Sequence, residues 1–244
     1  TYDLFKEKYD VDRNVHIIPT GIEIERFYKE NVDHKKVNEL KKQLMLLKDD
    51  FVIVFVGRIA EEKNIVFLIE AQREIAKKHD NIKLIIIGDG PDSDKYKQLV
   101  KKYKLDESVV FTGKVPWEQV PCYYQLADVF ATASTTETQG LTVIEAMAGG
   151  VAPLCIDDES FRNVVIDNLN GRIFKTKKDY IKDVFELYKD SSKLDSLSKQ
   201  ARINAERHSS KYYAEGVLDV YEQAIGGKPK PKGIFKWFAN FRRK

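Results

Sequence analysis

The sequence has little of several features that define common classes of protein. Of its 244 residues only two are cysteine, and no apolar run approaches the roughly 20 residues that cross a bilayer. Cys122 and Cys155 are too few for a disulfide framework, and both lie among apolar neighbours, where small buried thiols are common. A disulfide-rich secreted domain and a membrane-spanning protein are therefore excluded, and a reducing, cytosolic compartment is expected.

A nucleotide-binding P-loop, an initiator methionine and an N-terminal targeting segment are also missing from this sequence. No Gly-Lys-Thr or Gly-Lys-Ser triplet occurs, which excludes an ordinary P-loop nucleotide hydrolase. The chain begins with Thr1 instead of Met, and its first residues are typical of the middle of a helix and not of a targeting segment. We therefore expect the sequence to be a piece of a longer protein.

Positive charge is present but unevenly distributed. The net charge of the chain is +3, yet residues 228–244 alone carry seven Lys or Arg and no acidic residue. Residues 1–227 therefore have a net charge of −4, and the basic isoelectric point belongs to a tail.

From residue 51 onward, short β-branched apolar runs alternate with longer amphipathic stretches. Strands are predicted over residues 51–57, 83–88, 108–113, 128–133 and 151–156. Helices are predicted over residues 64–78, 92–104, 117–126 and 141–148, and helical patterns dominate residues 178–225. This alternation is typical of βαβ units. We predict an α/β fold, a Rossmann-like parallel sheet with helices on both faces and a helical C-terminal region.

The chain is predicted to have three parts. Residues 1–50 are expected to be a linker and the remnant of a preceding domain, with a strand over residues 16–22 and a helix over residues 37–48. Residues 51–225 form the predicted main domain, and residues 226–244 the basic aromatic tail. Ligands of open parallel sheets bind at the carboxyl ends of the strands, so chemistry is expected in the loops there.

The loop after the first predicted strand reads GRIAEEKN. Gly57 would let the backbone approach a ligand, while Arg58 and Lys63 could converge on a phosphate. The alternative is a loop with ordinary surface salt bridges.

The loop after the second strand, GDGPDS, begins like a dinucleotide-binding fingerprint. Its third glycine position holds Ser93, and the strand before it is not the first of a unit, so hydride transfer with NAD is weakly supported. Gly88 and Gly90 are instead predicted to make a tight turn that leaves room for a ligand.

The segment ASTTETQGLTVIEAMAGGVAP places Glu137 in a loop and Glu145 in the helix that follows. Between them, the amides of Gly140, Leu141 and Thr142 would form a helix N-terminus suited to a diphosphate. An ionised carboxylate can accept from two vicinal hydroxyls, so a carboxylate at each end fits a sugar nucleotide. The alternative is a solvated loop charge and an ordinary helix glutamate.

Four motifs, GRIAEEKN, GDGP, VVFTGKVP and ETQGLTVIEAMA, in this order and spacing resemble the donor-binding half of retaining GT-B glycosyltransferases of the large family 4 type. The resemblance covers roughly residues 15–225. The motif TETQGLT is most similar to that of bacterial diacylglycerol glucosyltransferases, which place glucose from UDP-glucose on a membrane lipid. The resemblance therefore implies glucose transfer to a lipid such as diacylglycerol. A polysaccharide or glycan acceptor, or a GT-B nucleotide-sugar epimerase, is the alternative.

The resemblance implies a role for each matching residue. Glu137 would bind hydroxyls of the transferred sugar, Glu145 would bind the ribose, and Arg58 with Lys63 would neutralise the diphosphate leaving group. Arg58, Lys63 and Glu137 are thus the expected catalytic residues. The remaining expected donor-binding residues are Gly57, Gly88, Gly90, Gly113, Lys114, Val115, Gly140, Leu141, Thr142 and Glu145. Among these, the loop of Gly113 to Val115 would receive the base.

No cofactor and no catalytic metal are expected, because fixed cations can stabilise the leaving group. The Asp-x-Asp of Asp10 and Asp12 precedes the sheet and is interpreted as a solvated turn. No protein nucleophile is assigned. The sequence departs from the family pattern at Ala133, Gln139 and the loop that begins at Asp157, and these loops bear on the choice of sugar. The resemblance also implies a missing acceptor domain, so the chain should bind nucleotide and turn over poorly or not at all.

The tail GIFKWFANFRRK is predicted to lie in the interface of an anionic membrane, because its aromatic residues form one stripe of a helix and its other positions are cationic. The predicted membrane-contacting residues are Lys232, Phe235, Lys236, Trp237, Phe238, Phe241, Arg242 and Arg243. The expected location is cytoplasmic and peripheral on the inner face of the cell membrane. The alternative is that the tail packs on the missing domain. Nucleic-acid binding is disfavoured because the acidic remainder offers no second basic face.

Overall fold

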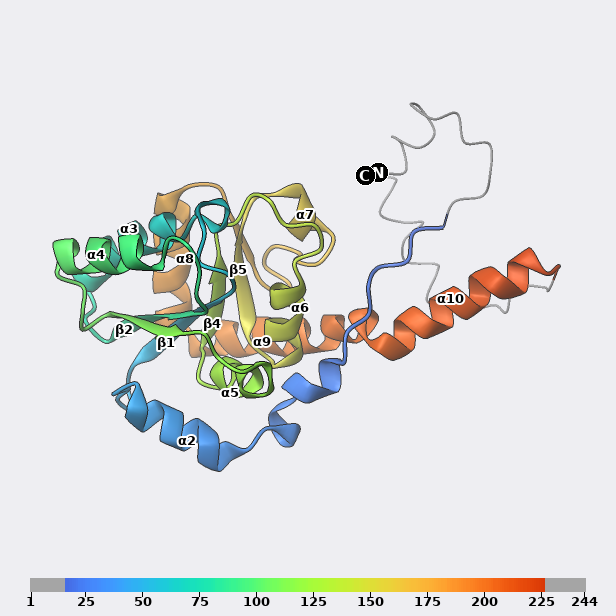
Figure 1. Cartoon of the computed structure of the whole chain (residues 1–244), viewed down its shortest axis with the longest axis horizontal. Coiled ribbons are helices and arrows are strands. Elements are labelled where there is room, and N and C mark those ends of the chain that lie inside the picture. The colour runs from blue at the N-terminus through green and yellow to red at the C-terminus, as the bar shows by residue number, and fades with distance from the viewer. Residues whose placement is uncertain (1–15, 227–244) are drawn as a thin grey trace. The chain divides into compact units, whose positions relative to one another are not determined.

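The computed structural model describes residues 16–226 (Figure 1). These residues form two compact units, one of Glu23–His208 and one that combines residues 16–22 with residues 209–226. The predicted membrane-contacting tail lies outside the described residues, as do Asp10 and Asp12, so the interpretations of both stay predictions. The predicted three-part division at residues 50 and 225 also stays a prediction.

The larger unit is built on a six-stranded parallel sheet with strand order β3-β2-β1-β4-β5-β6. The strands are β1 (Phe51–Val56), β2 (Ile82–Ile87), β3 (Val109–Gly113), β4 (Val129–Thr132), β5 (Ala152–Ile156) and β6 (Arg172–Phe174). The first five agree with the predicted strands to within one or two residues, and β6 was not predicted. The α/β fold class is therefore confirmed.

The α-helices of the described chain are α2 (His34–Gln43), α3 (Ile65–Ala76), α4 (Ser93–Tyr103), α5 (Val120–Tyr124), α6 (Leu141–Ala148), α7 (Glu159–Arg162), α8 (Lys177–Lys189), α9 (Ser191–Ala205) and α10 (Ser210–Ala224). Short 3₁₀ helices are η1 (Ile24–Phe27), η2 (Lys29–Asn31), η3 (Glu61–Lys63), η4 (Trp117–Gln119) and η5 (Glu206–His208). The helix predicted over residues 37–48 starts earlier, because Asp33 caps it by accepting from the amides of Lys35 and Lys36. None of the described helices is long and apolar enough to cross a bilayer.

The prediction of a strand over residues 16–22 is wrong. In the smaller unit this segment makes a single parallel bridge, between Ile22 and Ser209, and the amide of Ser210 donates to the carbonyl of Ile22 at 2.8 Å. A strand needs a neighbouring strand for its backbone groups, and here the neighbour is the start of α10. Gly21 permits the approach, since a Cβ there would lie 2.5 Å from the Cβ of Tyr213.

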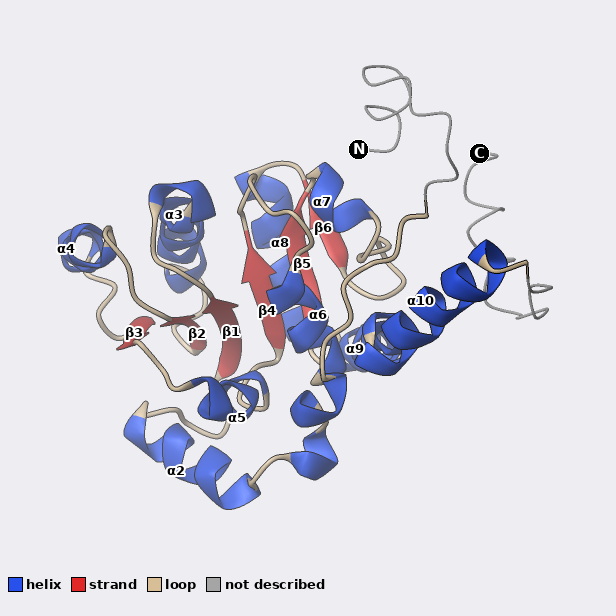
Figure 2. Cartoon of the chain, turned by 45° about the vertical axis from the view of Figure 1, so that its right-hand side comes forward, coloured by secondary structure: helices blue, strands red, loops and turns tan. Residues whose placement is uncertain are grey.

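Helices cover both faces of the sheet, as Figure 2 shows for α3 and α4 on one side and α5 on the other. Phe51, Ile53 and Phe55 of β1 belong to a core cluster shared with buried residues of α3, α4 and α8. The intervening Val52 and Val54 are buried on the opposite face. Strands buried on both faces read as continuous apolar runs, which is why FVIVFV and IKLIII are recognisable in the sequence. Cys122 and Cys155 are buried free thiols, as predicted, and burial raises the pKa of each.

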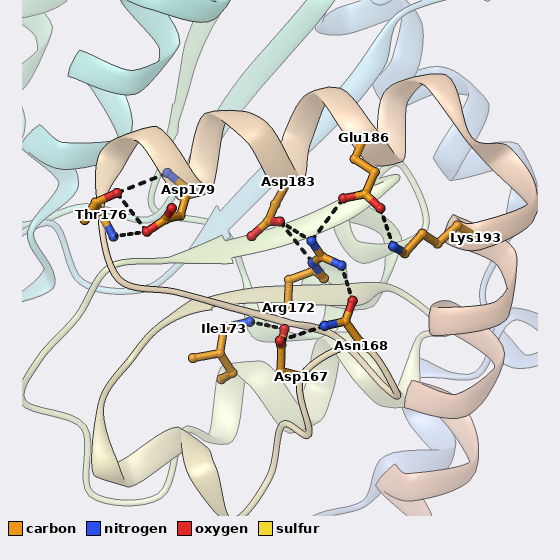
Figure 3. Close-up of polar contacts among 9 residues, drawn as sticks. All are labelled: Asp167, Asn168, Arg172, Ile173, Thr176, Asp179, Asp183, Glu186 and Lys193. Carbon is orange, nitrogen blue, oxygen red and sulfur yellow. Dashed lines mark hydrogen bonds and ion pairs between the residues drawn. The ribbon is translucent and has the colours of Figure 1, made fainter.

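A buried ionic cluster ties β6 to α8 and α9 (Figure 3). Arg172, only 8% exposed, donates from Nε to Asp183 Oδ1 at 3.0 Å and from Nη2 to Glu186 Oε2 at 3.0 Å. It also donates to the side chain of Asn168, and Glu186 accepts from Lys193 of α9. The guanidinium therefore satisfies a carboxylate that is buried with it, that of Asp183.

We predict that Arg172→Met lowers the free energy of unfolding by about 3 kcal/mol, because it leaves Asp183 buried without its cation. The control is Lys177→Met, which breaks an ion pair with Glu70 whose side chains are 42% and 40% exposed. That loss should stay below about 1 kcal/mol. Urea unfolding measures both. Equal losses in the two variants would show that the cluster is not a buried ionic network.

Candidate functional site

The strand order reverses between β1 and β4, and the loops that follow these two strands meet at their carboxyl ends. Asn64 Nδ2 donates to the carbonyl of Ala133 at 3.3 Å, and Ser134 Oγ donates to the carbonyl of Glu62 at 3.4 Å. Asn64 adopts the left-handed conformation, with φ of 51°, that ends η3 and starts α3. These bonds hold η3 against the start of the segment that carries Glu137.

Lys63 and Glu137 are brought together at this point. Lys63 Nζ donates to Glu137 Oε1, and the two side chains are 20% and 21% exposed. Glu137 is therefore not a solvated loop charge, which was the alternative left open by the sequence. The pair places a cation and a carboxylate side by side at the crevice, with two of the three ammonium hydrogens of Lys63 left for other acceptors.

The N-terminus of α6 follows directly after the Glu137 loop. Gly140, at φ of 61°, precedes the helix, and no side chain caps it. Because the first amides of a helix have no intrahelical acceptor, those of Leu141 and Thr142 are available to a ligand. A Cβ on Gly140 would lie 3.2 Å from the ring of buried Phe161, so the turn is packed from behind by α7. The helix dipole adds positive potential at this end.

Glu145 lies one turn into α6 and is half-buried. The hydroxyl of Tyr124 donates to Glu145 Oε2 at 2.9 Å. Burial raises the pKa of Glu145, while the Tyr124 hydrogen bond and the positive charge of Arg26 lower it. Tyr124 is fully buried, and burial raises its pKa well above the ordinary value. Glu145 is thus a carboxylate held in place, and not an ordinary exposed helix glutamate.

A pocket of about 270 Å³ lies at the carboxyl ends of β1, β2 and β3. It is lined by Val56, Gly57, Arg58, Ile87, Gly88, Asp89, Lys114, Val115 and Val120. Five predicted site residues contribute to this lining. Arg58 is exposed and lies here, whereas Lys63 is bonded to Glu137. The two cations predicted to converge on one phosphate therefore occupy different parts of the crevice.

Gly88 and Gly90 were predicted to make a tight turn that leaves room for a ligand; Gly88 lines the pocket, and both glycines also have a packing role. A Cβ on Gly88 would lie 1.9 Å from the carbonyl oxygen of Gly57, and one on Gly90 would lie 2.2 Å from that of Ile59. Both glycines therefore allow the loops after β1 and β2 to pack backbone against backbone. Gly88 also donates its amide to the carbonyl of Gly113 at 3.1 Å, which adds the loop after β3 to the same contact.

Ser93, at the position of a third fingerprint glycine, also serves this loop. Its hydroxyl donates to Asp89 Oδ1 at 2.6 Å, and the amide of Gly90 donates to the same oxygen at 2.8 Å. The hydrogen bond from Ser93 is the main reason that the pKa of Asp89 is lowered. The loop after β2 is therefore a turn that is stabilised by hydrogen bonds among its own residues.

Two residues that support the site have no recognisable sequence pattern. Tyr124 lies in an apolar stretch, and the role of Asn64 depends on its contact with Ala133. Within residues 16–226, no three or more His, Cys, Asp or Glu side chains gather as a metal site would require. The expectation of metal-independent catalysis stays a prediction.

Residues 36–204 match the family described as "Glycosyl transferases group 1". The chain is 38% identical to an alpha-monoglucosyldiacylglycerol synthase of Acholeplasma laidlawii over 214 residues, which is 88% of this chain and 54% of that enzyme. It is 31% identical to the synthase of the same name from Streptococcus pneumoniae over 178 residues, 73% of this chain and 40% of that enzyme. The chain thus spans about half the length of these curated relatives or less.

The fold is similar to that of Anabaena HepE in complex with UDP-glucose. The TM-score is 0.75 at 19% identity, over 85% of this chain and 57% of that one. At this identity the likeness concerns the fold, whereas the family match includes Lys63, Glu137 and Glu145 and covers most of the described residues. The chain therefore belongs to the group 1 family of glycosyltransferases, with a GT-B domain.

Proposed function

We propose that this chain is the donor-binding domain of a retaining glycosyltransferase that transfers glucose from UDP-glucose to a membrane lipid such as diacylglycerol. The observation that carries the proposal is the Lys63–Glu137 pair beside the uncapped start of α6. The names of the two synthase relatives support the lipid and the sugar, and the UDP-glucose bound to the structural neighbour supports the donor.

Lys63 and the amides of Leu141 and Thr142 would bind the diphosphate. Negative charge grows on the diphosphate as its bond to the anomeric carbon breaks, and donors already in place lower the barrier without reorganisation. Glu137 holds Lys63 through one oxygen, which leaves the other to accept from hydroxyls of the sugar.

Glu145 would accept from the ribose hydroxyls. Its Oε2 accepts a hydrogen bond from Tyr124, which fixes the orientation of the carboxylate. Its Oε1 would then accept from the ribose. The base would then enter the pocket at the loop of Lys114 and Val115, where Arg58 could contact the phosphates from the opposite side.

We predict that Glu145→Gln weakens UDP binding about 10- to 100-fold, because a hydrogen bond to a charged group contributes about 1.5–3 kcal/mol. Glu137→Gln should weaken UDP-glucose more than UDP, since its partner is the sugar. Calorimetric titration of both ligands measures the effects, with Lys177→Met as the control, because its ion pair with Glu70 involves no residue assigned to the site. Unchanged UDP affinity in Glu145→Gln would overturn the ribose assignment.

For the acceptor, we expect the full-length protein to transfer label from radioactive UDP-glucose to diacylglycerol and to give a chloroform-soluble glycolipid. Residues 1–244 alone should bind the donor and turn over at least about tenfold more slowly, because the chain spans about half of its relatives. Label recovered in a water-soluble glycan, or in an epimerised nucleotide sugar without transfer, would contradict the lipid assignment.

We also propose that residues 228–244 hold the enzyme on the cytoplasmic face of an anionic membrane. Seven cations at about 1 kcal/mol each near such a surface could contribute several kcal/mol before ordering costs. Cosedimentation with phosphatidylglycerol vesicles should fall sharply in a variant that ends at residue 227, and neither protein should sediment with phosphatidylcholine alone. Equal binding of both proteins to anionic vesicles would discard the anchor.

A further inference from the structure

An arginine–tryptophan stack involves the chain segment between two pocket-lining residues, Val115 and Val120, and has no part in the assignments above. The guanidinium carbon of Arg26, in η1, lies 3.1 Å from the ring centroid of Trp117. Trp117 opens η4, two residues after the pocket-lining Val115 and three before Val120. The indole remains 55% exposed although Arg26 covers part of it. A large exposed aromatic ring, held by a guanidinium and close along the chain to pocket-lining residues, is a surface on which a planar ligand can stack.

The backbone that carries Arg26 is fixed against α5 and α6. Ile24 and Phe27 of η1 are buried, and the Phe27 ring meets the Tyr124 ring edge to face with centroids 5.7 Å apart. Gln125 Nε2 donates to the carbonyl of Phe27 at 3.1 Å and to that of Gly149 at 3.0 Å. Figure 1 shows this blue segment running beside the labelled α5. Arg26 therefore projects from a rigid support.

The same support reaches Glu145. Tyr124 packs on Phe27 and donates to Glu145, and the charge of Arg26 also acts on that carboxylate. Of the other elements packed on α6, α9 buries Leu197, Ala201 and Ala205 and β5 reads APLCI, so neither brings a buried charge to it. Glu23 lies 4.0 Å from Arg26 at the exposed side of η1. The segment that carries Arg26 therefore packs on the tyrosine that holds Glu145.

We propose that Arg26 and Trp117 form a clamp for the nucleoside of the donor. Trp117 stacks on the base, and Arg26 is a positioning residue that holds Trp117 from the other face of the indole. This inference rests on the proposed function, in which the crevice takes a nucleoside diphosphate sugar. The segment before α2, which the sequence placed in a linker, thereby becomes part of the donor site.

Fluorescence isolates the tryptophan. The chain has two tryptophans, so Trp237→Phe leaves Trp117 as the single indole. Saturating UDP should change the emission of this variant, because stacking alters the surroundings of the ring. A Trp237→Phe protein that binds UDP by calorimetry with no change in emission would overturn the stacking of Trp117.

The UDP affinities of substituted proteins distinguish the contribution of the Trp117 ring from that of the Arg26 charge. Trp117→Ala should weaken UDP about tenfold, and Trp117→Phe should restore most of that loss because a ring remains. Arg26→Ala should also weaken UDP and shift the acid limb of UDP binding to higher pH, since Glu145 then loses a cation that lowers its pKa. Arg26→Lys retains the charge and should retain the pH profile.

The matched control is a second stack of the same kind. The guanidinium carbon of Arg202 lies 3.2 Å from the ring centroid of Tyr28, between α9 and the turn before η2. Arg202→Ala should lower the unfolding temperature without changing the UDP affinity or its pH profile. If the wild type binds UDP and both Arg26→Ala and Trp117→Ala bind it with affinities within about twofold of the wild type, the clamp is overturned and the proposed function is not. A wild type that does not bind UDP would overturn the proposed function as well.

Discussion

The loop after β1 has to lie in direct contact with two other loops, and the geometry of the site depends on that contact. On one side its carbonyls at Gly57 and Ile59 meet Gly88 and Gly90, where any Cβ would collide with the backbone. On the other side Asn64 donates to the carbonyl of Ala133. Arg58 and Lys63 both belong to this loop, so its position decides where the two cations of the crevice lie.

The two carboxylates of the crevice, Glu137 and Glu145, are held in different ways. Lys63 is bonded to Glu137, so the position of this cation is fixed by a carboxylate. Glu145 is a different case, because burial raises its pKa and two neighbours oppose that rise. The carboxylate of Glu137 orients Lys63, whereas that of Glu145 is itself oriented by Tyr124. This difference follows from which element each glutamate occupies, a loop or a packed helix.

The sheet and most of the site residues could be predicted because their signals are local. Strands such as FVIVFV are continuous apolar runs, and the glycines and acids of the loops follow them at short spacing. Tyr124 and Arg26 could not be predicted, since they act on Glu145 only through the packing of segments that are far apart in the sequence. The strand expected over residues 16–22 failed for a related reason, because the segment has apolar residues and no neighbouring strand to pair with. Local pattern also singled out Gly88 and Gly90, but their contacts with the carbonyls of Gly57 and Ile59 depend on how separate loops pack.

Where two loops pack backbone against backbone, few substitutions are tolerated. At Gly88 and Gly90 any larger side chain would meet a carbonyl oxygen at about 2 Å, so neither position can accept a substitution without a shift of the backbone. Under the proposed function, variation in sugar choice would then fall to exposed side chains of residues 135–139 and 157–162, such as Thr136, Gln139 and Glu159. The latter segment packs Phe161 behind Gly140. If the proposed function holds, libraries aimed at a different sugar belong at the exposed positions of those two segments, with both glycines left unchanged.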